Sequence, residues 1–196
     1  MRLNKKILVT GGSGYKGNKL IKELLKKNYS IINVDKNLFG NYFIKHPKIK
    51  NYKMDLMDID KINLKNVYAC IHLSSIANDP MTELNPSLSW ETSALSTKIL
   101  LDKLIKNKVK KIIYASSSSV YGSKKELNVK ENLFLKPISL YNKAKMITER
   151  VVRSFEKDID YVIIRPATVC GFSRRMRYDV TVNALTLSAL LNNKII

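Results

Sequence analysis

Three kinds of side chain that together can assist the oxidation of an alcohol, by removing its proton while an oxidant takes its hydride, lie in two short segments of the chain. A run of serines, Ser116 to Ser119, follows an apolar segment, and Tyr141 and Lys145 stand four residues apart further on. Residues at positions i and i+4 share one face of a helix, so the tyrosine hydroxyl and the lysine ammonium can act on one substrate. The pattern predicts Tyr141 as a general base, Lys145 as its cationic partner and Ser117 as a donor to the substrate oxygen.

Glycines spaced for a phosphate-binding turn lie near the N-terminus. The apolar run 6–10 leads into three of them, at every third position: Gly11, Gly14 and Gly17. In a strand–turn–helix unit, such glycines let backbone N–H groups approach a pyrophosphate, which then faces a helix N-terminus. Asp35 ends the next apolar run, where a carboxylate can accept the ribose 2′-hydroxyl of a dinucleotide. The spacing predicts NAD as the cofactor because the carboxylate repels the 2′-phosphate of NADP, although Lys36, next in the chain, can weaken that preference.

The two segments complement each other chemically. Bound NAD places a positively charged nicotinamide ring beside the reacting alcohol, in addition to the ammonium of Lys145. Two nearby cations are expected to lower the pKa of Tyr141 from about 10 to about 7, which takes about 4 kcal/mol of differential stabilisation. Lys145 is also expected to contact the nicotinamide ribose. The combination predicts an oxidoreductase site.

Alternating strands and helices must position these motifs. Short apolar runs predict six strands: Lys6–Thr10, Ser30–Asp35, Ile49–Met54, Val67–Leu73, Lys111–Ala115 and Tyr161–Arg165. Apolar residues at helical spacing predict four helices: Asn18–Asn28, Leu88–Asn107, Ser139–Phe155 and Val180–Leu191. Repeated strand–helix units with right-handed crossovers predict an α/β fold, a doubly wound parallel sheet of the Rossmann type with strand order 3-2-1-4-5-6. Residues 194–196 are typical of the start of a further strand.

Composition places the chain among globular proteins. Its 196 residues suffice for one α/β domain, and hydrophobic residues make up 45% of them. Apolar runs are too short for a transmembrane helix or a signal peptide, so we expect a cytoplasmic protein with no membrane partner. Cys70 and Cys170 lie in apolar runs and are expected to be buried free thiols. The histidines and cysteines show no ligand spacing, so no metal site is predicted.

The formal charge of +19 has two interpretations. A basic protein can bind nucleic acid, but these lysines are scattered, no basic block alternates with aromatic residues, and no nucleic-acid-binding motif occurs. Lysines on ordinary solvated faces explain the same charge, so no specific nucleic-acid partner is expected. The charge favours anionic small ligands and non-specific binding to polyanions.

Three motifs together resemble a known family. They are Thr-Gly-Gly-Ser-Gly-Tyr-Lys-Gly (10–17), Ser-Ser-Ser-Ser-Val-Tyr-Gly (116–122) and Tyr-Asn-Lys-Ala-Lys (141–145). In this combination, and over nearly the whole chain, the sequence is similar to the extended short-chain dehydrogenase/reductases, the NAD-dependent sugar-nucleotide epimerases and dehydratases. The resemblance implies catalytic roles for Ser117, Tyr141 and Lys145. Besides the glycines and Asp35, it implies cofactor contacts at Tyr15, Lys16, Asp55, Leu56, Leu73, Ser74, Ser75 and Ala167.

The same resemblance implies a nucleotide-sugar substrate. Thr168 would lie near the nicotinamide. Thr168 and Ser117 would both contact the sugar. Arg175 and Arg177 follow the sixth strand, on the side where the family binds its substrate. Arginine forks match diphosphate oxygens, although a solvated basic loop is the simpler alternative.

The function expected from the resemblance is an NAD-dependent epimerase that acts on a nucleotide-activated sugar through a transient keto intermediate. A keto-sugar reductase or a dehydratase with the same site is the alternative within the family. Ser118 and Ser119 stand where its dehydratases carry acidic residues, so no 4,6-dehydratase activity is expected. The alternative from a different class is a non-catalytic NAD-binding or polyanion-binding protein. The sequence leaves the sugar, the nucleotide and the oligomeric state open, with a homodimer as one candidate.

Two departures from the family remain. Lys16 stands at a position that is usually apolar, where backbone contacts to phosphate survive and the ammonium can add to them. Family members also continue beyond Ile196 with a segment that completes the substrate pocket. We therefore expect residues 1–196 to form an NAD-binding domain that carries the catalytic residues but lacks this C-terminal part. Such a chain should bind NAD with little or no epimerase turnover, because positioning the sugar can be worth about 7–11 kcal/mol of barrier.

Overall fold

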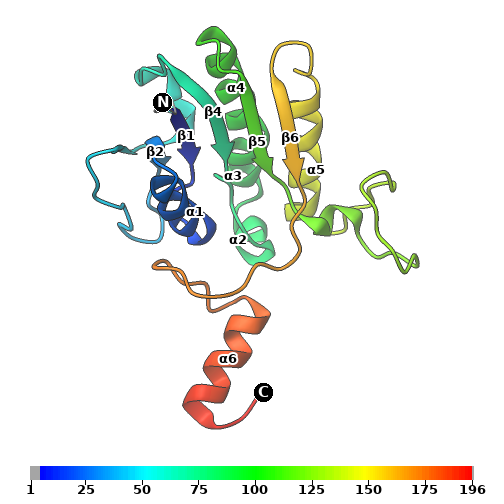
Figure 1. The fold of residues 1–196 in the computed structure, drawn as a ribbon. Helices are drawn as coiled ribbons and strands as arrows, with labels where there is room; N and C mark the ends of the chain where they lie inside the picture. The colour runs from blue at the N-terminus through cyan, green and yellow to red at the C-terminus, as the bar shows by residue number, and fades with distance from the viewer. Residues whose placement is uncertain (1–4, 196) are drawn as a thin grey trace.

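The structure, a computed structural model, describes residues 5–195 and contains a six-stranded parallel sheet (Figure 1). Its strands are β1 Lys6–Thr10, β2 Ser30–Asp35, β3 Ile49–Lys53, β4 Val67–His72, β5 Lys111–Ala115 and β6 Asp160–Ile164. They lie side by side in the order β3-β2-β1-β4-β5-β6, and every neighbouring pair is parallel. The predicted fold class and strand order are therefore confirmed, and each strand end falls within one residue of its expected position.

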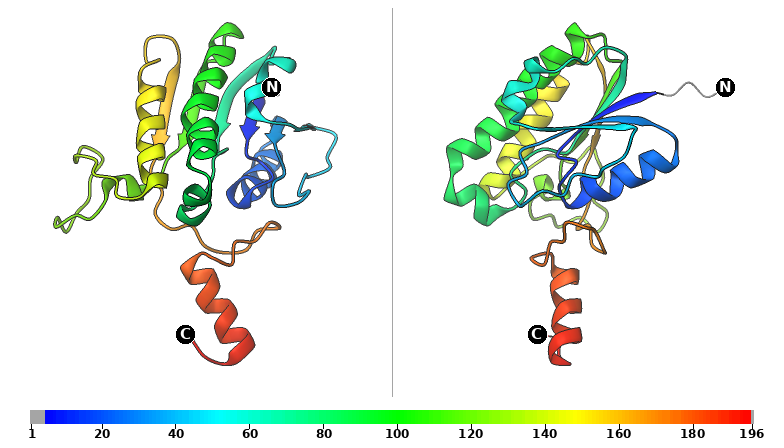
Figure 2. Two further views of the ribbon diagram at one scale, coloured as in Figure 1. Left: turned by 180° about the vertical axis from the view of Figure 1, so that it is seen from behind. Right: turned by 90° about the vertical axis from the view of Figure 1, so that its left-hand side faces the viewer.

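Helices cover both faces of this sheet. The α-helices are α1 Tyr15–Lys26, α2 Asp79–Leu84, α3 Pro86–Trp90, α4 Ser96–Lys106, α5 Leu140–Arg153 and α6 Thr181–Asn192. Shorter helical turns are η1 Leu56–Lys61 and η3 Ser118–Tyr121, both 3₁₀, and the π-helical η2 Glu91–Leu95. Figure 2 shows α1 on one face of the sheet and α4 and α5 on the other, while α6 extends away beyond the carboxyl ends of the strands.

The long helix expected at 88–107 differs from the prediction at its start and in its winding. It begins at Pro86, because the Asn85 side chain accepts a hydrogen bond from the Leu88 amide and proline is well suited to a first helical turn. The chain then winds as a π-helix over η2 before it continues as α4. The sequence pattern does not predict this insertion, nor the short helix α2.

The expected strand at 194–196 is not formed within the described residues. Asn193 adopts a left-handed conformation with φ 51° and ends α6, a common way for a helix to stop. The Ser188 hydroxyl then donates a hydrogen bond to the Lys194 carbonyl, so the chain turns back towards the helix. Ile196 lies outside the described residues.

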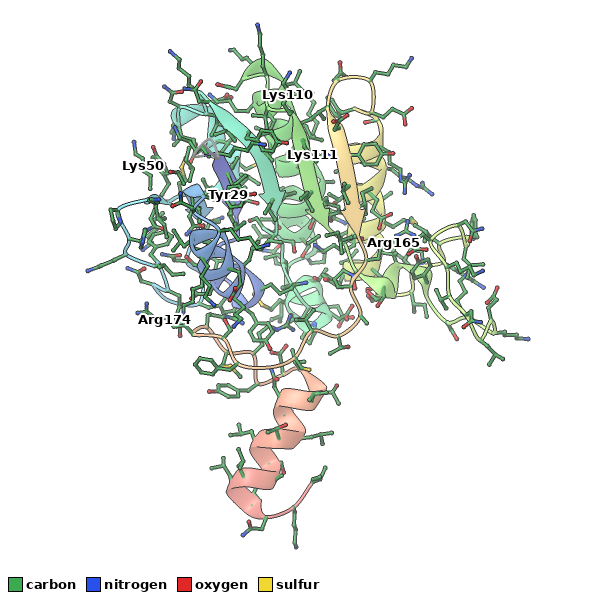
Figure 3. All side chains as sticks on the ribbon, viewed as in Figure 1. Tyr29, Lys50, Lys110, Lys111, Arg165 and Arg174 are labelled. Atoms are coloured by element: carbon green, nitrogen blue, oxygen red, sulfur yellow. The ribbon has the colours of Figure 1, made fainter. Side chains whose placement is uncertain are left out.

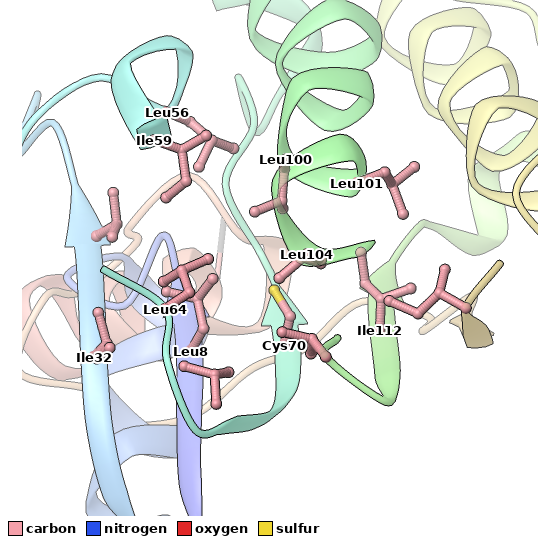
Figure 4. Packing of buried hydrophobic residues seen from close by; sticks show 14 of the residues in the cluster. Leu8, Ile32, Leu56, Ile59, Leu64, Cys70, Leu100, Leu101, Leu104 and Ile112 are labelled. Carbon is pink, nitrogen blue, oxygen red and sulfur yellow. The ribbon is translucent and has the colours of Figure 1, made fainter. Parts of the chain in front are cut away.

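The main hydrophobic core lies between the sheet and helices α4 and α5 (Figure 4). Leu100, Leu101 and Leu104 of α4 are fully buried against Leu8 of β1 and Ile112 of β5. Full burial of one such side chain is worth about 1.5–3 kcal/mol, so this layer contributes much of the fold's stability. A smaller cluster packs under α1 on the opposite face.

Coverage of the sheet is uneven at its β6 edge. Tyr161 and Ile163 of β6 pack against the main core, whereas Val162 and Ile164, which alternate with them, are 42% and 48% exposed. The face that α1 covers near β1 and β2 is therefore open at β6. Helix α6 also carries exposed leucines.

The two cysteines differ in burial. Cys70 is buried as expected, and burial raises the pKa of its thiol. Cys170 is exposed, contrary to the prediction, because the chain after β6 leaves the sheet for the surface. Over residues 5–195, no helix is both long and apolar enough to cross a bilayer.

Candidate active site

The glycine-rich turn forms a tight backbone cradle between β1 and α1. Gly11 has φ +73°, a left-handed conformation, and its amide donates to the Val34 carbonyl at 2.8 Å. A Cβ on Gly17 would lie 2.3 Å from the Gly11 carbonyl oxygen, so only glycine fits there. The turn therefore presents backbone close to whatever binds at the start of α1.

A cavity of about 140 Å³ opens over this cradle. Most of the predicted cofactor contacts line it together: Gly11, Gly14, Tyr15, Lys16, Gly17, Asp35, Leu73, Ser74 and Ser75. Ser13, in the same turn, has a buried hydroxyl with no hydrogen-bond partner among the described residues. Backbone N–H groups at a helix N-terminus and an unpaired hydroxyl suit an anion with many acceptor oxygens, as the diphosphate of a dinucleotide has.

Besides Ser117, Tyr141 and Lys145, four of the predicted contact residues lie away from this cavity. Asp55 and Leu56 line a small adjoining cavity next to Asp35 and Ser74. Ala167 lines a separate cavity at the end of β6, beside Arg165. Thr168 is exposed on the segment that follows.

Asp35 is held in place at the edge of the cradle. One carboxylate oxygen accepts a hydrogen bond from the Ser13 amide at 2.9 Å, and the other accepts from the Asn37 amide at 2.7 Å. Each oxygen keeps further acceptor capacity, so the carboxylate can also bind hydroxyl groups. Its position at the end of β2 is the one that the sequence predicts.

The structure brings Ser117, Tyr141 and Lys145 together at the carboxyl ends of the strands. Ser117 precedes η3, and its hydroxyl lies 2.7 Å from that of Ser119. Tyr141 is in the first turn of α5, and Lys145 follows one turn later, with its ammonium 5.9 Å from the tyrosine ring centre. The Lys145 ammonium donates to the Ala115 carbonyl at 2.8 Å, which fixes the helix to the end of β5.

Burial is the main influence on the pKa values of Tyr141 and Lys145. Burial raises the pKa of Tyr141, and this outweighs the lowering by the hydrogen bond from Ser117 and the charge of Arg177. Burial, followed by the charge of Lys16, lowers the pKa of Lys145 to about 7. Burial dominates for both groups. The expected lowering of the pKa of Tyr141 also needs the positive nicotinamide ring of bound NAD, so it stays a prediction.

A buried ion pair, Glu149 with Arg165, lies next to the cluster of Ser117, Tyr141 and Lys145. Glu149, one turn after Lys145, is 1% exposed and accepts two hydrogen bonds from Arg165, at 2.9 and 2.7 Å. The Ser116 hydroxyl also donates to Glu149, at 2.5 Å, and Arg165 donates to the Tyr121 hydroxyl. Figure 3 places Arg165 at the carboxyl end of β6. Glu149 thus joins α5 to Ser116 at the end of β5 and to Arg165 at the end of β6.

His72 forms a second buried network that sequence reasoning missed. Its Nδ1 lies 2.6 Å from the Thr10 hydroxyl and its Nε2 lies 2.9 Å from the Thr97 hydroxyl, which links β4 to β1 and α4. Burial, helped by the charge of Lys145, lowers the pKa of His72 to about 3. The imidazole is therefore neutral at physiological pH and serves as a hydrogen-bonding spacer.

Arg175 and Arg177 line the same cavity as the glycine cradle. The Arg175 guanidinium lies 4.1 Å from the centre of the Phe39 ring, at the loop after β2. Arg177 pairs with Asp179 at 2.5 Å and donates to the Ala77 carbonyl at 3.3 Å. The segment that carries them is fastened to α1, because the Tyr15 hydroxyl donates to the Gly171 carbonyl at 2.5 Å.

Asp79 is a further acidic group near the catalytic cluster. Its negative charge is one of the influences that raise the pKa of Tyr141, and its Oδ1 is buried without a hydrogen-bond partner among the described residues. It begins α2, which packs against α5. The Asn-Asp-Pro sequence at 78–80 is a helix-start signal that could have drawn attention to it. Over residues 5–195, no group of three or more metal-ligating side chains is found.

Comparison with known proteins identifies the family. Residues 7–194 match the model described as "NAD dependent epimerase/dehydratase family". The chain belongs to this family. Membership confirms the resemblance drawn from the motifs, and the family's cofactor, NAD, is the one that the sequence predicts.

Individual members of the epimerase/dehydratase family are similar over most of this chain. A putative UDP-glucose 4-epimerase of Methanocaldococcus jannaschii is 31% identical over 96% of the chain and 64% of its own length. A UDP-glucose 4-epimerase of Lactobacillus helveticus is 29% identical over 86% of the chain and 53% of its own length. The solved UDP-N-acetylglucosamine 4-epimerase of Methanobrevibacter ruminantium superposes with a TM-score of 0.87 at 28% identity, over 97% of this chain and 64% of that one. The chain thus spans less than two thirds of the length of these relatives.

Proposed function

We propose that this chain is the cofactor-binding and catalytic part of an NAD-dependent epimerase that acts on a nucleotide-activated sugar through a transient keto intermediate. The observation that carries the proposal is the placement of the glycine cradle, Ser117, Tyr141 and Lys145 at the same edge of the sheet. The names of the relatives, several of them UDP-sugar 4-epimerases, support it.

The cradle residues would hold NAD by its diphosphate. Backbone N–H groups at the start of α1, the Ser13 hydroxyl and the Lys16 ammonium supply donors, and Asp35 accepts ribose hydroxyls. Asp55 and Leu56 would lie towards the adenine, and Leu73, Ser74 and Ser75 would line the cofactor from β4. Ala167 is proposed as a contact beyond β6. When bound there, NAD would supply reversible hydride transfer at the sugar carbon.

The catalytic residues would manage one proton. Tyr141 takes the proton from the sugar hydroxyl and later gives it back, while Ser117 donates a hydrogen bond to the same sugar oxygen. A protonated Lys145 stabilises the phenolate. Burial is the larger cause of the lowered pKa of Lys145, and the charge of Lys16 is the second. An anionic diphosphate beside Lys16 would offset the second cause and so raise the pKa of Lys145, which favours the protonated ammonium.

The substrate half of the site is proposed from fewer residues. Arg175 and Arg177 would bind the diphosphate of the nucleotide sugar, and Thr168 would contact the sugar. About a third to a half of the length of these relatives lies outside the matched region, and we infer that this additional part supplies the rest of the sugar pocket. Residues 1–196 would then be the NAD-binding domain, with little turnover by themselves.

Epimerisation is favoured over 4,6-dehydration by the residues after Ser117. Removal of water needs a carboxylic acid near the leaving hydroxyl, whereas Ser118 and Ser119 carry hydroxyls and Ser119 is hydrogen-bonded to Ser117.

The free cysteines fit a reducing compartment such as the cytoplasm, and a homodimer is the assembly we propose.

The experiment that tests this function measures NAD binding and nucleotide-sugar interconversion on the same preparation. We expect binding of NAD together with slow interconversion, which Tyr141→Phe abolishes without removing the cofactor. Failure to bind NAD would contradict the proposal. Turnover at an ordinary enzymatic rate would show that the relatives' additional part is dispensable.

A further inference from the structure

A close ion pair lies where the cofactor's adenosine end would bind. The Lys36 ammonium is 2.6 Å from Oδ2 of Asp55, between the loop after β2 and the loop after β3. The other oxygen of Asp55 accepts the Met57 amide at 3.0 Å, so the carboxylate begins η1 as its cap. Lys36 and Asp55 line one small cavity together with Asp35 and Leu56.

The direction of the Lys36 side chain matters because of its neighbour. Asp35 faces the cradle, with its carboxylate anchored by the Ser13 and Asn37 amides. Lys36 is the next residue, so its ammonium is a cation that could bind a phosphate at the ribose 2′-position, as could Arg175, which lines the same cavity as Asp35. In the structure this ammonium is instead bound to Asp55. Burial alone would raise the pKa of Asp55, but the hydrogen bonds from Lys36 and the Met57 amide outweigh it, so the pKa is lowered and the carboxylate stays charged.

We propose that Asp55 is a specificity-determining residue: by holding the Lys36 ammonium, it withholds this cation from the 2′-phosphate of NADP and so reinforces the discrimination by Asp35. The inference rests on the proposed binding of a dinucleotide in the cradle. It gives Asp55 a role distinct from contact with the adenine ring, because that ring is the same in NAD and NADP.

The distinction between the two roles can be measured. The ratio of the NADP and NAD dissociation constants cancels any contact that both cofactors make, including contacts to adenine. Asp55→Asn keeps an oxygen to accept the Met57 amide but removes the charge that holds Lys36. Lys36→Gln removes the cation itself. The two substitutions and their combination form a double-mutant cycle.

Calorimetric titration of the 196-residue chain with NAD and with NADP is the test. We expect Asp55→Asn to improve NADP affinity relative to NAD by about fivefold at low salt, a gain that shrinks at high salt because it is a charge interaction. Lys36→Gln alone should not improve NADP affinity relative to NAD, because it removes the cation and leaves the Asp55 carboxylate uncompensated. The double variant should lose the gain, because the released cation is then absent. Asp60→Asn, at the ion pair between η1 and Lys103 of α4, is the matched control and should leave the ratio of the two dissociation constants unchanged.

Two results would overturn the proposal. An unchanged ratio in Asp55→Asn, with circular dichroism showing a folded protein, would mean that the ion pair does not govern cofactor choice. A gain in NADP affinity that persists in the double variant would mean that loss of the Asp55 charge, and not the released Lys36 ammonium, changes the cofactor preference. Failure of every variant and of the unsubstituted chain to bind either cofactor would instead contradict the proposed function itself.

Discussion

The cofactor half and the catalytic half of the site hold their functional groups by different means. The cofactor half relies on backbone atoms of the glycine turn and on partly exposed carboxylates at the ends of β2 and β3. The catalytic half relies on ionisable side chains removed from water, with Lys145 3%, Glu149 1% and His72 0% exposed. Substitutions in the first half should change which ligand binds, whereas substitutions in the second should change folding stability and proton equilibria.

The largest effect should follow from breaking the buried ion pair of the catalytic half. Glu149→Ala leaves the Arg165 guanidinium without its partner and the Ser116 hydroxyl without its acceptor. The free energy of unfolding should fall by about 3–5 kcal/mol, as measured by urea denaturation. Glu23→Ala, which removes an exposed ion pair with Lys26 on α1, should leave the midpoint of urea denaturation unchanged. A similar result for both variants would remove the difference between the two halves.

The next effect is a loss of stability in acid that depends on His72. Its folded pKa of about 3 lies below the ordinary value of about 6.5, so the unfolded chain takes up a proton that the folded chain refuses. The free energy of unfolding should therefore fall as the pH drops from about 6.5 to about 3, by up to about 1.4 kcal/mol per pH unit. His72→Gln should flatten this dependence in urea titrations at a series of pH values. An equally steep loss in the variant would assign the acid sensitivity to other groups.

In the cofactor half, the expected change is in selectivity. NAD should bind more tightly than NADP, and Asp35→Asn should narrow that gap by about tenfold, because the amide accepts a ribose hydroxyl but does not repel a phosphate. Calorimetry with both cofactors measures it, and urea denaturation should show little change in stability. Equal or tighter binding of NADP by the unsubstituted chain would contradict the role of Asp35.

The smallest effect concerns the arginines that lie between the two halves. Arg175→Ala and Arg177→Ala should each weaken binding of a nucleotide sugar by about threefold and leave NAD affinity nearly unchanged, since partly exposed charge pairs are worth under about 1 kcal/mol. Titration of the NAD-saturated protein with the nucleotide sugar measures it. A matching loss of NAD affinity would assign both arginines to the cofactor, in whose cavity the structure places them.

The difference between the cofactor half and the catalytic half also explains which features could be predicted from the sequence. The cradle, Asp35 and the pair Tyr141 and Lys145 follow local spacing rules, and the strands that carry them are short apolar runs, so all were predictable. Glu149 and Arg165 belong to different elements, a helix and the residue after a strand. Nothing in the local pattern of either residue requires the other, so their bond appears only when the fold is assembled.

Two further features escaped prediction for related reasons. The π-helical turn at η2 has no signal in the sequence, because the apolar spacing around it is ordinary. The pKa of Tyr141 rises because burial outweighs the hydrogen bond from Ser117 and the charge of Arg177. Burial of a polar group depends on the surrounding elements, which a motif does not describe.

The central claim is that the glycine cradle binds NAD independently of the buried catalytic cluster. Its most direct test is calorimetric titration of NAD into the unsubstituted chain, Tyr141→Phe and Gly17→Val. We predict one binding site with similar affinity in the first two and no binding in the third, whose side chain would collide with the Gly11 carbonyl. Loss of binding in Tyr141→Phe as complete as in Gly17→Val, or binding retained in Gly17→Val, would contradict the account.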